Sequence, residues 1–110
     1  MRLPNAESAL VDMRKIREYC LSPHHPRGRH KARVFETVLG ITDRDSEELE
    51  ETLRQAILDN EAVPGVPDEF GKRYIVDFSM ARNGKNATIR SCWIVLKNEQ
   101  IPRFVSCFLL

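Results

Sequence analysis

The stretch Lys72-Arg73-Tyr74-Ile75-Val76-Asp77-Phe78-Ser79-Met80, followed by Asn83-Gly84, decides the fold of this 110-residue chain. Its apolar residues alternate with polar ones, and a period of two predicts a strand with one buried face. Asn-Gly is a strong signal for a two-residue hairpin turn. The buried side would then carry Tyr74, Val76, Phe78 and Met80, and the other side Arg73, Ile75, Asp77 and Ser79.

Two further strands follow, at residues 87–96 and 103–109. In the first of them, Ile89, Ser91, Trp93 and Val95 share one side, and Arg90 and Cys92 lie on the other. The second half of the chain is therefore predicted to be an antiparallel meander of three, or four, strands. Helices must cover one of its faces, because three strands alone bury too little apolar surface to be stable.

Helical periodicity dominates the first half of the chain. Asp12 is placed to cap a helix that runs to about Cys20, a second helix runs from about His30 to Gly40, and a third runs from Thr42 to about Asp59. Residues 3–10 are predicted to be an extended lead-in, and residues 24–29 and 60–71 to be loops. These elements predict one α+β domain spanning residues 1–110.

Composition excludes several classes of protein. With 42% hydrophobic and 30% charged residues, the chain is of the ordinary globular kind, and no apolar run approaches the roughly 20 residues that cross a bilayer. We expect no membrane contact and a cytoplasmic location, in a target cell if the chain is the end of a longer delivered protein. Three cysteines do not make a disulfide framework, and buried thiols are expected at Cys92 and Cys107.

Charge is divided unevenly along the chain. Residues 1–41 carry eight Lys/Arg and four Asp/Glu, residues 42–70 carry two and ten, and residues 71–110 carry seven and two. The acidic middle segment is explained by a solvated helix face. The division of charge has two interpretations, and both stay open. Either the two basic flanking segments attract a polyanion, or the acidic helix only keeps the domain soluble.

The densest cluster of chemically able residues occupies the predicted 24–29 loop and the following helix start. It could hold a phosphate or simply be a solvated basic loop. The members are His24, His25, Arg27, Arg29, His30, Lys31 and Arg33. A zinc site is a third hypothesis, but the spacing of Cys20, His24, His25 and His30 matches no standard zinc motif. We therefore assign no metal ligand and expect no cofactor.

Four segments carry a family resemblance over nearly the whole chain. They are Leu3-Pro4-Asn5-Ala6, the HPxGxxKA segment His25-Pro26-Arg27-Gly28-Arg29-His30-Lys31-Ala32, Trp93-Ile94, and Pro102-Arg103-Phe104-Val105-Ser106-Cys107. Together they resemble an uncharacterised bacterial domain family that occurs alone or at the C-terminal end of polymorphic toxins. The chain's ending is also similar to that of the barnase, EndoU, colicin and RelE group of metal-independent ribonucleases.

The resemblance implies a ribonuclease or RNA-binding domain of toxin type. Its catalytic residues would be His30, Lys31, Arg90 and Ser106, with His25 as an alternative to His30, and its substrate-binding residues His25, Arg27, Arg29, Arg73 and Arg103. In metal-independent RNA cleavage, the histidine would act as base or acid. Lys31 and Arg90 would stabilise the charged phosphorane, and the Ser106 hydroxyl would position it. Phe108 stands where the family often has Tyr, so no phenol is available as proton donor.

A non-enzymatic function is the alternative. The same basic surface would then bind a small acidic antitoxin or immunity protein instead of RNA.

Overall fold

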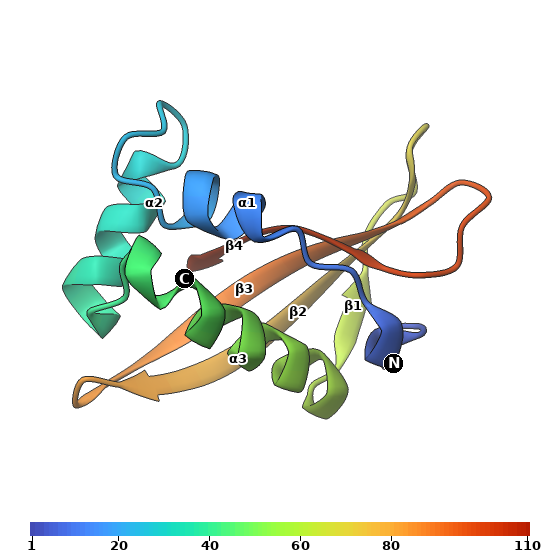
Figure 1. Ribbon diagram of the computed structural model, residues 1–110. Helices are drawn as coiled ribbons and strands as arrows, with labels where there is room; N and C mark the ends of the chain where they lie inside the picture. The colour runs from blue at the N-terminus through green and yellow to red at the C-terminus, as the bar shows by residue number, and fades with distance from the viewer.

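Helices cover one face of a four-stranded antiparallel sheet in the computed structural model, which describes residues 1–110 (Figure 1). Each strand pairs with the next one along the chain, in the order β1 (Ala62–Pro64), β2 (Gly71–Arg82), β3 (Lys85–Leu96) and β4 (Arg103–Leu109). The α+β class and the antiparallel meander predicted from the sequence are thus confirmed, with four strands present.

The first strand corrects one prediction, since residues 60–71 were expected to form only a loop. Ala62, Val63 and Pro64 pair with Val76, Ile75 and Tyr74 of β2. A three-residue strand is too short to show a period of two, and the Pro64-Gly65 pair gives a strong loop signal.

The hairpin of β2 and β3 is the longest pairing in the molecule. It runs from Gly71 opposite Leu96 to Arg82 opposite Lys85. The turn residues Asn83 and Gly84 have φ angles of 56° and 70°, as the predicted Asn-Gly turn requires. Both strands extend closer to the turn than their predicted limits at residues 80 and 87.

The three predicted helices are present, and their caps are confirmed. Helix α1 (Met13–Lys15) is capped by Asp12 and continues as a π-helical segment, Ile16–Cys20. Helix α2 (Arg29–Val34) continues likewise through Phe35–Leu39 and ends at Gly40, whose φ is 65°. Thr42 forms a capping box over a 3-10 turn, Asp43–Asp45, before α3 (Ser46–Asp59). None of the helices is long and apolar enough to span a membrane.

The entry segment is more structured than the predicted extended lead-in. It contains a 3-10 turn, Ala6–Ser8, and then pairs with the chain around the start of β4. The Leu10 N–H donates to the Pro102 carbonyl and the Phe104 N–H donates to the Leu10 carbonyl, each at 2.9 Å. Residues near the two ends of the sequence are thereby joined.

The core lies between the inner face of the sheet and α3. The predicted inner residues of β2 are all buried, and so are the predicted apolar positions of α3, which are Leu49, Leu53, Ala56 and Ile57. Trp93 lies at the centre, edge-on to Phe104 at 5.3 Å between ring centroids. The buried Ser91 hydroxyl donates to the Val76 carbonyl at 2.7 Å and accepts from Trp93 Nε1–H at 2.9 Å.

Replacing Ser91 with alanine should lower the free energy of unfolding by about 1–3 kcal/mol, because the buried indole N–H loses its acceptor. Urea denaturation measures the change. Thr88→Ala on the same strand is the control, since Thr88 is exposed, and it should change stability by less than about 0.5 kcal/mol. Equal effects of the two substitutions would contradict the account.

Candidate functional site

His25, the first residue of the HPxGxxKA segment, has a structural role. Its Nδ1 atom accepts the backbone N–H groups of Arg27 at 3.0 Å and Gly28 at 3.1 Å. Its ring meets Tyr19 edge-on, with 4.7 Å between ring centroids. The imidazole therefore closes the turn that leads into α2.

Gly28 is required by a close approach of two backbones. A Cβ atom at this position would lie 2.3 Å from the carbonyl oxygen of Tyr19. Ala32, one turn further along α2, is buried. The HPxGxxKA segment thus packs α2 against the segment Ile16–Cys20. Among its residues, Lys31 is the one that reaches the face of the sheet that no helix covers.

The open face, which no helix covers, brings three of the four predicted catalytic residues together. Arg90 is opposite Phe108 in the β3–β4 pairing, and Ser106 is opposite Cys92 two pairs further along, on the same face. The Lys31 ammonium lies 4.4 Å from the centroid of the Phe108 ring, a cation–π distance. The fourth residue, His30, is exposed on α2 beside Lys31.

Arg90 is not a free cation. Its Nε and Nη2 atoms each donate to a carboxylate oxygen of Asp77 at 2.9 Å, in the bidentate geometry that arginine and carboxylate favour. Strand alternation puts Asp77 on the same side as Arg73 and Arg90 and thus predicts a cross-strand partner at one of the two, and the structure selects Arg90. A phosphate at this position would compete with Asp77 for the guanidinium.

The predicted substrate-binding arginines fall into two groups. Arg73 is paired with Asp68 at 2.6 Å and Arg103 with Glu99 at 2.9 Å, and these contacts hold the pKa values of Asp68 and Glu99 below their ordinary range. The pKa of each carboxylate is lower in the folded protein than in the unfolded chain, so each ion pair stabilises the fold at pH values above the unfolded pKa. This stabilisation is lost as the pH falls through the folded-state pKa. Arg27 and Arg29 are exposed and form no ion pair, which leaves the free positive charge on the α2 side.

The cysteines do not belong to a metal-binding cluster. Cys20 and Cys107 lie against each other in the core, and the Cys20 side chain together with burial raises the pKa of Cys107 well above its usual value. Cys92 is half-buried on the open face, so the expected buried thiol is confirmed for Cys107 and wrong for Cys92. Burial raises the pKa of Cys92, and the nearby Ser106 lowers it less.

The zinc hypothesis finds no ligand set. No group of three or more His, Cys, Asp or Glu side chains is arranged to hold a metal ion. Cys20 faces the core, and His25 uses Nδ1 to close a turn.

Two features of this surface were missed by reasoning from the sequence. One is the set of exposed apolar residues in β1 and in the connection from β1 to β2, which are Val63, Val66 and Phe70. Their signal was available, because large apolar side chains within a loop rich in Pro and Gly need a reason to be there. The other is the pairing of Arg73 with Asp68 and of Arg103 with Glu99, which depends on loop conformations as well as on strand register.

The model of a domain of unknown function, DUF6883, matches residues 2–110. The chain belongs to this family. The resemblance to an uncharacterised domain family is thereby confirmed. No curated protein gives a significant sequence match.

One solved structure is similar over nearly the whole chain. It is a chain of a structure titled "Contact-dependent growth inhibition toxin - immunity protein complex from Klebsiella pneumoniae 342". The TM-score is 0.71 at 21% sequence identity, and the match covers 92% of this chain and 99% of that one. The DUF6883 domain and that chain therefore share a fold.

Gly28→Ala should lower the free energy of unfolding by about 1–3 kcal/mol or more, since the added methyl group meets a rigid backbone carbonyl. Gly65→Ala is a matched control, because its Cβ would be 3.6 Å from the nearest atom, an ordinary contact. Urea denaturation of both variants tests the structural role of the motif. A Gly28→Ala protein as stable as Gly65→Ala would contradict it.

Proposed function

We propose that this domain acts by binding a protein partner, as one member of a pair of the toxin–immunity kind. The fold shared with a chain of such a complex supports this, since the match spans almost all of both chains. The observation that carries the proposal is an apolar loop on the surface.

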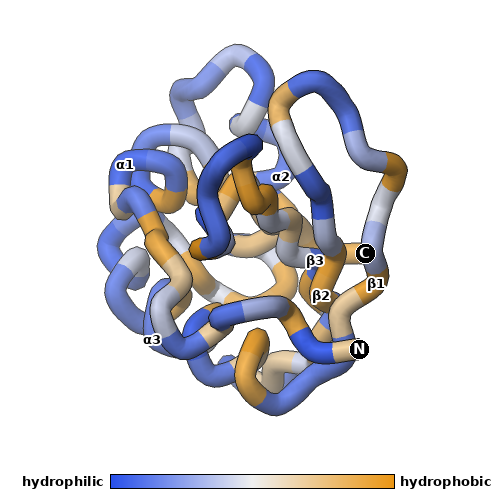
Figure 2. Tube along the Cα trace, turned by 90° about the vertical axis from the view of Figure 1, so that its right-hand side faces the viewer, coloured by the Kyte–Doolittle hydropathy of each residue, from blue (hydrophilic) through white to orange (hydrophobic).

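The apolar loop, residues 62–70, joins α3 to β2 and includes β1. Its part beyond β1 stands out from the rest of the chain at one end of the sheet in two perpendicular views (Figures 1 and 2). The side chains of Val63, Val66 and Phe70 are 62%, 86% and 57% exposed. Large apolar side chains exposed on a loop are candidates for a protein contact, where a few such side chains supply most of the affinity.

The backbone of the apolar loop is held in place. Asp68 Oδ1 accepts the N–H groups of Phe70 at 2.9 Å and Gly71 at 3.2 Å, and its other oxygen pairs with Arg73. The Phe70 carbonyl accepts the Lys97 N–H at 3.0 Å, which joins the loop to the β3–β4 connection. A loop ordered before binding loses less entropy when a partner covers it.

A second candidate function, metal-independent RNA cleavage, is favoured by one observation. Lys31, Arg90 and Ser106 approach one another on the open face, around Phe108. There the Lys31 ammonium would stabilise the charge of a phosphorane and the Ser106 hydroxyl would orient it, while His30 would move the proton. The Arg90–Asp77 pair and the absence of a phenol at Phe108 favour protein binding over this function.

The partner should be the product of the neighbouring gene, and replacing both Val66 and Phe70 with serine should weaken the complex at least tenfold, or about 1.4 kcal/mol. Co-purification and titration of the co-expressed proteins measure this. Leu58→Ser, which alters a 46% exposed leucine on α3, is the control and should bind like the wild type. Undiminished binding by the double variant would rule out the apolar loop as the contact.

If the second candidate is correct, the purified chain should cleave transfer RNA in EDTA. Lys31→Ala and Ser106→Ala should each slow cleavage about 100-fold, the typical size of such contributions. Lys97→Ala removes an exposed cation in the β3–β4 connection, at the opposite end of this strand pair from Arg90 and Phe108, and should leave the rate unchanged. Intact RNA in every reaction, or equal cleavage by all variants, would eliminate the ribonuclease hypothesis.

A further inference from the structure

Strand β2 has a free edge beyond its short partner β1. The pairing of β1 ends with Ala62 opposite Val76, and no strand lies beside residues 77–82 on that side. In an antiparallel sheet, the N–H and C=O groups of alternate residues point to the same neighbour. The Gly65 N–H donates to the Arg73 carbonyl, so the same alternation directs the backbone groups of Asp77, Ser79 and Ala81 to the free edge.

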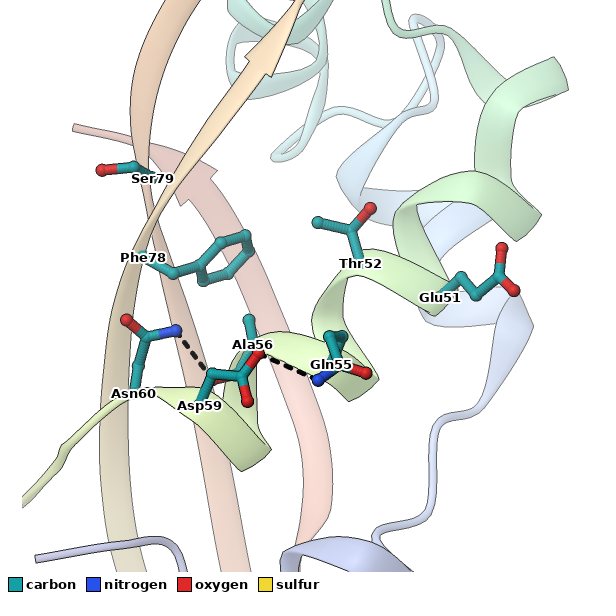
Figure 3. Close-up of a pocket in the computed structure, with 8 residues that line it drawn as sticks. All are labelled: Glu51, Thr52, Gln55, Ala56, Asp59, Asn60, Phe78 and Ser79. Carbon is teal, nitrogen blue, oxygen red and sulfur yellow. Dashed lines mark hydrogen bonds between the residues drawn. The ribbon is translucent and has the colours of Figure 1, made fainter.

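A groove of about 500 Å³ separates this edge from α3. The Phe78 ring points from β2 toward the helix, and Thr52 and Ala56 lie on the helix side (Figure 3). Asn60 closes one end, where its side-chain amide donates to the Ala56 carbonyl at 2.9 Å. The space beside the free edge is therefore open, with a floor that is partly apolar.

The rim of the groove is acidic. Glu51 and Asp59 lie along it on α3, and neither forms an ion pair, whereas the Glu50 carboxylate is paired with Arg54 and the Glu48 carboxylate with Arg82. Asp59 accepts only the Gln55 amide, at 2.9 Å. Two unneutralised carboxylates thus border the groove on its helix side, across from the unpaired backbone groups of β2.

We propose that an extended, basic segment of the protein partner binds as an added strand along β2 residues 77–82. This inference rests on the proposed function and adds the chemistry of one segment of the partner. Backbone groups of the segment pair with Ser79 and Ala81, as exposed strand edges allow. Alternate Lys or Arg side chains lay their apolar stems over Phe78 and Ala56 and carry their charges to Glu51 and Asp59.

The test uses a seven-residue synthetic peptide with Lys at alternate positions and Val or Thr between them. Amide hydrogen exchange of the intact chain should slow at Ser79 and Ala81 when this peptide binds. A peptide of the same sequence, N-methylated at the amides that would face β2, keeps the charge but cannot pair, and it should give no protection. Equal binding of both peptides, or binding without protection of these amides, would overturn the proposal.

Charge is tested separately, with variants that leave the fold intact. Neutralising Glu51 and Asp59 together, as Glu51→Gln and Asp59→Asn, should weaken peptide binding about fivefold, consistent with two exposed ion pairs. Glu7→Gln with Glu36→Gln is the matched control, because both residues are exposed and lie outside the groove. An equal loss in the two double variants would contradict the acidic rim as the specific contact.

Binding experiments with the product of the neighbouring gene separate this inference from the proposed function, because the two can fail independently. A complex that forms without protecting Ser79 and Ala81 would overturn the added strand and leave partner binding through the apolar loop. A gene product that does not bind, combined with a peptide that still protects these amides, would overturn the proposed function and support the site on the edge.

Discussion

The register between β2 and β3 is the constraint on which the rest of the structure depends. The Asn83-Gly84 turn sets it, and the Ser91 hydroxyl reinforces it by bonding both Val76 and Trp93. A slip of one residue would exchange the faces, moving Trp93 to the surface and Arg90 into the core. The position of α3 over the sheet, the Arg90–Asp77 pair and the free edge of β2 all follow from this pairing.

Much of the fold could be predicted from the sequence, and the parts that could not have physical reasons. Strong periodicity and local caps placed the three helices, and the hairpin was marked by its turn. β1 was missed because three residues carry no measurable period, and the π-helical segments because they have no simple signal. For the candidate site, the family resemblance named Arg90 and Ser106, which the structure places on one face, but the neutralisation of Arg73 and Arg103 depends on loop conformations that residue spacing does not encode.

The most recognisable motif of the chain is chiefly a packing motif. His25 closes a turn, Gly28 allows two backbones to approach, and Ala32 is buried, so the likeness of this segment to its family reflects the docking of α2. The acidic α3 is likewise more than a solvated face, because its carboxylates neutralise Arg54 and Arg82 and line the groove beside β2. The two surfaces that we propose for binding, the apolar loop and the free edge, therefore lie outside the motif.

Calorimetric titration of the purified chain tests the central claim most directly, with the neighbouring gene product in one cell and transfer RNA in another, both in EDTA at about 0.15 M salt. Binding through the apolar loop predicts a one-to-one protein complex with a Kd of about 1 μM or tighter, near −8 kcal/mol, and no heat of binding or cleavage with RNA. Tight binding or cleavage of RNA, with no protein complex, would contradict the account.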